Sequence, residues 1–140
     1  MKTALTIEES QRLIDLGVDP KLASMVSWKQ TETWARKSIL SNEEHLTLKP
    51  FRPMVMGFER FETKDVFTLA DLLSILTKEI KQVKKHPMTM VVYWHSINNE
   101  WNAYYDYSEF SPIKSSPELI DALNSLLIWV LENNLNQENQ

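Results

Sequence analysis

The chain contains no cysteine, which excludes disulfide bonds, thiolate catalysis and sulfur-ligated metal sites. Glycine is also scarce, because only Gly17 and Gly57 occur in 140 residues. Dinucleotide-binding fingerprints and P-loops need several clustered glycines, since their backbone N–H groups must approach phosphate closely. The composition therefore argues against both of these common nucleotide sites.

Long apolar runs, a basic surface and metal-ligand spacing are missing as well. No stretch approaches the roughly 20 apolar residues of a membrane-spanning helix. Residues 1–9 hold no apolar segment of the kind found in signal peptides. The net charge of −4 argues against nucleic acid as a partner. His45, His86 and His95 do not have the spacing of a metal motif. We therefore expect a cytoplasmic protein without a membrane segment, a metal or another cofactor.

Two helix start signals lie close together near the N-terminus. Thr6 and Glu9 form a capping box for a first helix, and Gly17 is suited to end it. Asp19-Pro20 combines a capping residue with a proline at the first helical position. It predicts a short second helix that continues to Val26.

Two further helices are predicted later in the chain. Thr68 caps a helix with Asp71 at its third position, and a leucine-rich stripe follows. Ser116-Pro117-Glu118 opens the last helix, and Asn133-Asn134 is expected to end it.

Strand signals are weaker between these helices. Alternating residues predict a strand over residues 27–34, and apolar residues predict another over residues 54–61. Pro50 and Pro53 bracket a loop in which Arg52 is an exposed candidate for a partner contact. The sequence leaves the remaining structure of residues 35–66 open.

All four tyrosines of the chain lie between residues 93 and 107. Residues 88–97 and 100–107 alternate around Asn98-Asn99, which predicts a β-hairpin with a two-residue turn. The register that follows pairs Tyr93 with Tyr104, Trp94 with Ala103, His95 with Asn102 and Val91 with Asp106.

The order of elements predicts the α+β class. We expect an antiparallel sheet of three to five strands that includes the hairpin in the C-terminal half, with helices packed on one face. Residues 1–135 are predicted to form a single globular domain, and residues 136–140 a frayed polar tail.

The two faces of the predicted hairpin differ in composition. The more apolar face is assigned to the core and carries Met90, Val92, Trp94, Trp101, Ala103, Tyr105 and Tyr107. The other face combines aromatic rings with polar groups, which is typical of a hydrated recognition surface. The candidate binding residues are Tyr93, His95, Asn102, Tyr104 and Asp106 on this face, together with Arg52. Cross-strand aromatic pairs also stabilise sheets by about 0.2–1 kcal/mol, so a purely structural role stays open.

Three stretches, together with the aromatic hairpin, resemble a group of small uncharacterised bacterial proteins of gut anaerobes, prophages and mobile elements. The stretches are Leu13 to Pro20 (LIDLGVDP), Phe67 to Leu76 (FTLADLLSIL), and Glu118 to Asn133, which begins ELIDAL and ends WVLEN. The resemblance covers most of the chain and rests on structural motifs. It implies a cytoplasmic accessory role and assigns no functional residue.

The absence of catalytic, metal and phosphate motifs predicts a non-enzymatic protein-interaction module with a protein partner. The alternative is a small-molecule-binding domain or minor enzyme with a pocket near His95, Tyr104 and Asp106. We assign no catalytic residue, because the predicted register places Asp106 opposite Val91 rather than beside His95. The oligomeric state stays open.

Overall fold

The computed structural model describes residues 1–32, 44–53, 60–79, 82–83, 86–87, 89–106 and 112–138. Its antiparallel strands and separate helices confirm the α+β class. In chain order the elements are α1 (Ile7–Asp15), the 3₁₀ turn η1 (Pro20–Leu22), β1 (Met25–Glu32), β2 (His45–Leu48), β3 (Arg60–Val66), α2 (Leu69–Ser74), the π-helical turn η2 (Ile75–Glu79), β4 (Gln82–Val83), β5 (His86–Pro87), β6 (Thr89–His95), β7 (Glu100–Asp106), β8 (Lys114–Ser116) and α3 (Leu119–Glu138).

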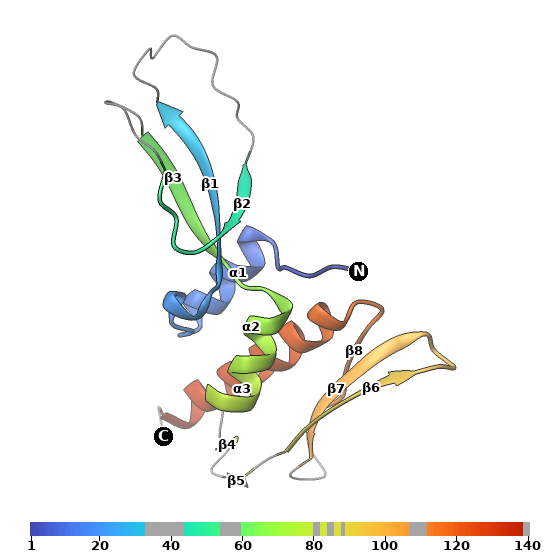
Figure 1. The fold of residues 1–140 in the computed structure, drawn as a ribbon. Helices are drawn as coiled ribbons and strands as arrows, with labels where there is room; N and C mark the ends of the chain where they lie inside the picture. The colour runs from blue at the N-terminus through green and yellow to red at the C-terminus, as the bar shows by residue number, and fades with distance from the viewer. Residues whose placement is uncertain are drawn as a thin grey trace.

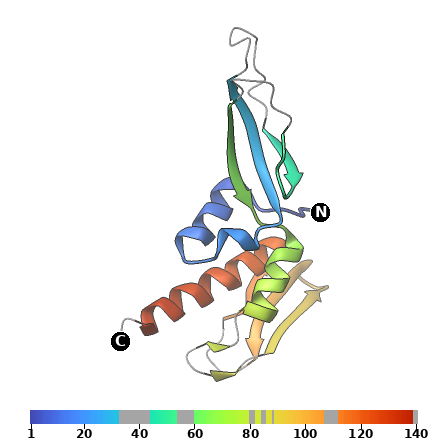
Figure 2. The same cartoon turned by 60° about the vertical axis from the view of Figure 1, so that its left-hand side comes forward.

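The strands are divided between two three-stranded sheets that lie on opposite sides of the helices (Figures 1 and 2). The first sheet has the order β2-β1-β3 and the second the order β6-β7-β8, while β4 and β5 form a short separate pair. The sequence predicted one sheet. Two sheets form because α2 follows β3 directly and carries the chain to the other side of the helices before β6 begins.

The capping signals of α1 are confirmed. Thr6 Oγ1 accepts a hydrogen bond from the Glu9 backbone N–H at 3.1 Å, and Glu9 Oε1 accepts one from the Thr6 N–H at 2.9 Å. The helix ends before Gly17, which adopts a φ of +110° that other residues rarely adopt. Local chemistry alone thus sets both ends of α1.

The predicted second helix is wrong beyond its first turn. Asp19 caps it as expected, with Oδ1 accepting the N–H of Lys21 at 2.9 Å, but the helical turn ends at Leu22. β1 begins at Met25, and Val26 pairs with strands on both of its sides. Sheet pairing of a β-branched residue here outweighs the helical pattern.

The sequence missed most of β3. The predicted strand over residues 54–61 overlaps β3 only at its start, and residues 54–59 lie outside the described residues. β3 continues to Val66 through charged residues that form ion pairs with neighbouring segments. Glu62 lies 3.4 Å from Lys29 of β1, and Asp65 pairs with Lys49. Because these charges replace an apolar alternation, hydrophobic periodicity did not reveal the strand.

The capping box of α2 is confirmed and also fastens the first sheet. Asp71 Oδ2 accepts the backbone N–H of Thr68 at 2.9 Å, together with the N–H and hydroxyl of Ser24 at 2.8 and 2.9 Å. Ser24 lies directly before β1. One carboxylate therefore joins the start of β1 to the start of α2.

The last helix, α3, is longer than predicted. It continues to Glu138, through the Asn133-Asn134 pair that was expected to end it and into the predicted tail over residues 136–140. The side-chain amide of Asn133 donates to the carbonyl oxygen of Trp129 at 2.7 Å. Because this hydrogen bond to a carbonyl one turn earlier occupies the side-chain amide of Asn133, the amide does not bond other backbone groups and interrupt the helix.

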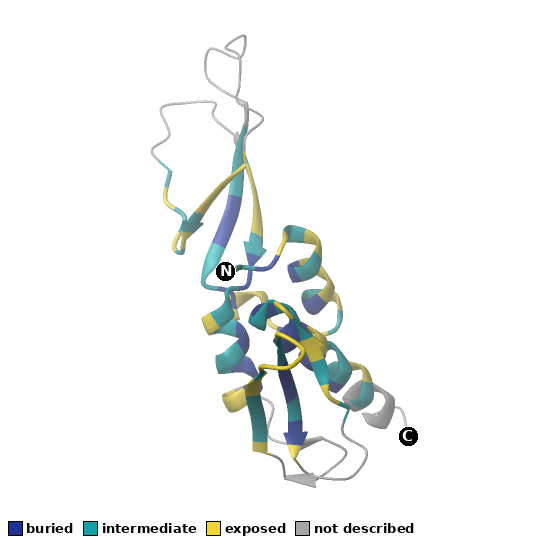
Figure 3. Ribbon diagram, turned by 90° about the vertical axis from the view of Figure 1, so that its right-hand side faces the viewer, coloured by how far each residue is buried: buried dark blue, intermediate teal, exposed yellow. Residues whose placement is uncertain are grey.

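The main core lies between α1, α2, α3 and the second sheet (Figure 3). The largest side chains without exposed surface are Leu13, Phe67, Leu72, Leu76, Tyr105, Ile120, Leu123, Leu126, Leu127 and Val130. Most of them come from α2 and α3, whose leucine-rich stripes the sequence predicted. Burial of these stripes against β7 positions the hairpin.

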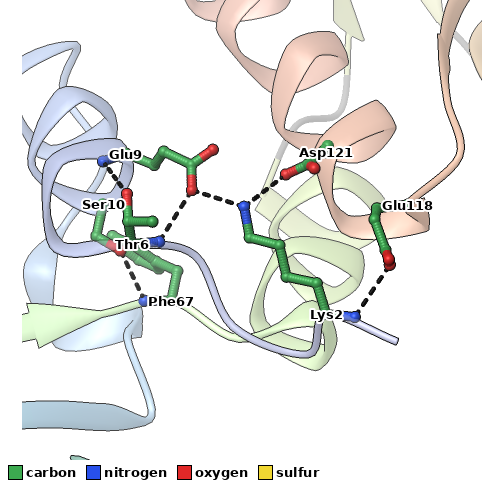
Figure 4. Close-up of polar contacts among 7 residues, drawn as sticks. All are labelled: Lys2, Thr6, Glu9, Ser10, Phe67, Glu118 and Asp121. Atoms are coloured by element: carbon green, nitrogen blue, oxygen red, sulfur yellow. Dashed lines mark hydrogen bonds and ion pairs between the residues drawn. The ribbon is translucent and has the colours of Figure 1, made fainter.

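Polar contacts of the N-terminal segment bind α1 to α3 (Figure 4). Lys2 Nζ lies 2.9 Å from Glu9 Oε1 and 2.8 Å from Asp121 Oδ1, while the Lys2 backbone N–H donates to Glu118 at 3.0 Å. The hydrogen bonds to Asp121 and Glu9 raise the pKa of Lys2. Burial alone would raise the pKa of Glu9, but hydrogen bonds from the Thr6 N–H and Lys2 leave it below its ordinary value.

A second contact in Figure 4 holds the junction between β3 and α2. The Ser10 hydroxyl of α1 accepts the Phe67 backbone N–H at 3.2 Å, and neither residue has exposed surface. The Phe67 carbonyl accepts the Leu5 N–H at 2.9 Å. Both backbone groups of this buried residue are thereby satisfied.

Replacing Ser10 with alanine removes the acceptor for a buried N–H. We expect the S10A variant to lose about 1–3 kcal/mol of unfolding free energy, despite the higher helix propensity of alanine. Urea unfolding followed by far-UV circular dichroism measures this loss. S125A is the matched control, because Ser125 is an exposed serine of α3. Equal midpoints for S10A and S125A would contradict the assigned role of Ser10.

Replacing Lys2 with methionine removes two ion pairs that are partly exposed to solvent. We expect a loss of about 0.5–1 kcal/mol at neutral pH, since solvent screens such pairs. Because the pKa of Glu9 in the folded protein lies below its ordinary value of 4.5, the ionised carboxylate stabilises the fold fully above pH 4.5. This stabilisation is lost as the pH falls through the lowered pKa. Because the pKa of Lys2 lies above its ordinary value of 10.5, the charged Lys2 stabilises the fold fully below pH 10.5. This stabilisation is lost as the pH rises through the raised pKa.

Thermal unfolding of wild type and K2M from pH 3 to 8 checks this dependence. The two midpoints should converge at acid pH and differ near pH 7. K21M is the matched control, because the exposed Lys21 side chain makes no ion pair with another described residue. A wild-type to K2M difference that stays constant over the whole range would exclude the electrostatic explanation.

Candidate binding surface

The hairpin of β6 and β7 has a longer turn than the sequence predicted. His95 pairs with Glu100, so the turn contains residues 96–99 rather than Asn98-Asn99 alone. His95 Nδ1 accepts the backbone N–H of Asn98 at 3.2 Å, which stabilises the wider turn. Asn99 supplies the positive φ, at +52°. The predicted pairing is therefore displaced by two residues.

A displacement by two residues leaves every side chain on its predicted face, because side chains alternate with a period of two. Ala103 and Tyr105 are buried, and Met90, Val92 and Trp101 pack against the main core. Tyr107 lies outside the described residues. The division into an inner and an outer face is thus confirmed for these residues.

Trp94 is the exception on the inner face. It is 46% exposed, and its ring meets that of its partner Trp101 edge-on, with centroids 5.5 Å apart. The turn end of the hairpin projects beyond the helices (Figure 1). Because Trp94 lies next to that end, the helices do not cover it, and its assignment to the core was wrong.

Tyr93 and Tyr104 form the aromatic pair of the outer face, although not as direct cross-strand partners. Tyr93 pairs with Asn102, and Tyr104 pairs with Val91. The two tyrosine rings are diagonal neighbours with centroids 6.4 Å apart and planes at 86°. Tyr93 is 39% exposed, and Tyr104 is half-buried. Two adjacent rings with polar ends are therefore presented to solvent.

Asn102 does not belong to the accessible surface. It is buried, and its Oδ1 accepts the hydroxyl of Ser115 at 2.6 Å. Ser115 belongs to β8, which pairs with β7 directly beside Asn102. The sequence analysis did not predict this third strand, so the burial of Asn102 could not be foreseen. Its role is to hold β8 in place.

His95 and Asp106 lie at opposite ends of the hairpin. Asp106 pairs with Thr89, at the far end of β6 from His95. His95 lies six positions after Thr89 in the same strand, which corresponds to about 20 Å at the usual rise per residue. The structure therefore brings His95 beside Tyr93, with ring centroids 6.4 Å apart, and does not bring it to Asp106.

Arg52 is far from the hairpin in the chain: it is an exposed residue of the loop that follows β2 of the first sheet. Next to it is an aromatic cluster that the sequence analysis did not anticipate. The cluster consists of Trp28, His45, Phe51 and Phe61. Its members come from β1, β2, β3 and the loop. The alternation around Trp28 and the two prolines beside Phe51 were its only signals, and neither indicates which rings meet.

Neither a metal-binding cluster nor a membrane-spanning helix occurs in the described part of the chain. It contains no group of three or more histidine, aspartate or glutamate side chains arranged to hold a metal ion. None of its helices has the length and hydrophobicity needed to cross a membrane. Comparisons with protein-family models, curated protein sequences and solved structures give no significant match.

The inner face of the hairpin is anchored by a hydroxyl group. Tyr105 donates to the carbonyl oxygen of Leu76 in η2 at 3.0 Å, and its burial raises the pKa of the phenol. We expect Y105F to lose about 1 kcal/mol of unfolding free energy, because the buried carbonyl loses this bond.

Urea unfolding of Y105F and of the control Y93F compares how much the tyrosine hydroxyl on each face of the hairpin contributes to the unfolding free energy. The exposed Tyr93 hydroxyl should contribute within about 0.5 kcal/mol of zero. A loss in Y93F as large as that in Y105F would mean that the outer face also carries stability.

Proposed function

We propose that the chain is a cytoplasmic, non-enzymatic accessory module that binds a protein partner through the outer face and tip of its C-terminal hairpin. The observation that carries this proposal is the exposure of large apolar side chains around the turn. Tyr93 is 39% exposed, Trp94 46% and Ile97 85%. Tyrosine and tryptophan are enriched at protein interfaces because each combines a large ring with one polar group.

The position of β6 supports the same surface. Among the described strands, β6 is at an edge of its sheet and pairs on one side only, with β7. An edge strand can accept an extended segment of another chain through its backbone groups. Tyr93 and Trp94 point to opposite faces of this strand, so a partner that pairs with it would meet a ring on each face.

The stabilising contacts of the hairpin lie elsewhere. The helices bury its inner face, and the Asn102–Ser115 bond joins β7 to β8. Tyr93 and Trp94 nevertheless leave large parts of their rings exposed to solvent, as an interaction surface would. The resemblance to small proteins of bacteria and mobile elements agrees with an accessory role and stays a prediction.

A capture experiment from the native host tests the proposal. Tagged wild type is compared with a Tyr93→Ala/Tyr104→Ala variant and with a Leu46→Ala/Leu48→Ala variant, which removes exposed apolar side chains from the first sheet. We expect the hairpin variant to retain at least tenfold less of a specific partner, as for interface hot spots. The Leu46/Leu48 variant should retain the wild-type amount. A partner captured equally by all three proteins would refute the assignment of this surface.

A further inference from the structure

The first sheet carries a hollow that is independent of the hairpin surface. Trp28 and Gln30 share one face of β1. On that face Trp28 pairs with His45, and Gln30 pairs with Phe61. The loop after β2 returns over the same face and places Phe51 against both Trp28 and Phe61. Trp28, Phe61 and the loop border a hollow of about 580 Å³.

The aromatic side chains of Trp28, Phe51 and Phe61 line this hollow beside prolines and polar residues. Trp28 lies in the centre of the cluster, stacked on His45 with ring centroids 4.5 Å apart. Its centroid is 5.2 Å from that of Phe51 and 5.9 Å from that of Phe61. None of these four residues belongs to the main core, and all keep some exposed surface. Such a cluster offers ring faces to a planar molecule.

Arg52 adds a positive charge at the edge of the hollow. It is exposed, and the described residues offer it no ion pair, in contrast to the nearby Lys49, which is paired with Asp65. An arginine beside aromatic walls is suited to bind a carboxylate through two parallel hydrogen bonds.

Two lining side chains also lack hydrogen-bond partners among the residues that the structure describes. The indole N–H of Trp28 and the hydroxyl of Thr47 are buried, and neither is bonded to any group in the described part of the chain. Buried polar atoms are normally bonded, so exceptions need an explanation. A ligand that carries a hydrogen-bond acceptor would supply the missing partner after a small displacement of the rings.

We propose that this hollow binds a small planar aromatic carboxylic acid, with its ring against Trp28 and Phe51 and its carboxylate on Arg52. The volume lies within the usual range of small-molecule sites, about 300–1,000 Å³. The rings of Trp28 and Phe51 match the aromatic part of the ligand, and the guanidinium of Arg52, which has no ion pair among the described residues, matches the acid. This site is separate from the hairpin surface, so each can fail without the other.

Titration of the ¹⁵N-labelled full chain with indole-3-acetate tests the proposal. The chain has five tryptophans, and the spectrum of a Trp28→Phe variant identifies the Trp28 indole signal. We expect that signal to shift to saturation with indole-3-acetate. The uncharged indole-3-acetamide should bind about tenfold more weakly, because it lacks the charge that arginine recognises.

The Arg52→Gln variant should bind the acid and the amide equally, while Arg12→Gln should keep the wild-type preference. Arg12 is a matched surface arginine on α1 that pairs with Glu132. Unchanged thermal midpoints establish that both variants are folded. The proposal is overturned if the Trp28 signal does not move at millimolar acid, if the amide binds wild type as well as the acid, or if all indole signals shift alike. The proposal would also be overturned if an acidic peptide shifted the Trp28 signal and the aromatic acid did not.

Discussion

The arrangement of the whole molecule depends on how Phe67 is held. Its side chain has no exposed surface, and its N–H and C=O are bonded to Ser10 and Leu5. The neighbouring N–H of Leu69 is bonded to the Thr3 carbonyl. This short stretch is where β3 becomes α2, so it joins the first sheet to the helices. Buried backbone groups are almost always paired, so the bonds of Phe67 to Ser10 and Leu5 hold this junction in one arrangement.

The hairpin shows how one segment meets two demands. Most residues on its inner face pack against the main core, and Tyr105 is bonded to Leu76 of η2. On its outer face, Tyr93 and Tyr104 contact each other and keep exposed surface. The outer aromatic pair still adds sheet stability, since adjacent rings on a sheet attract. Tyr93 of this pair is still 39% exposed, and this exposure is one of the observations on which the proposed recognition role rests.

Sequence patterns predicted the features that depend on neighbouring residues. The capping boxes of Thr6 and Thr68 and the two faces of the hairpin follow from short-range chemistry. Features that depend on distant partners were missed. Asn102 is buried by β8, which comes from a separate segment of the chain. The charged residues of β3 form ion pairs, so the strand has no hydrophobic alternation by which it could be predicted. Trp28 contacts rings that lie 17 to 33 positions away in the sequence. Nothing local to Trp28 distinguishes it from an ordinary strand residue.

The alternation of β6 and β7 has an evolutionary consequence. Under the proposed function, stability constrains the inner residues that pack on the core, whereas recognition constrains exposed outer residues such as Tyr93, and the two kinds of position alternate along each strand. Under the same proposal, a lineage could change its partner by substitutions at exposed outer positions while the inner positions stay constant. Among descendants of this sequence, variability along the hairpin would then oscillate with a period of two, and its loss would mark a lineage that had abandoned one of the two roles.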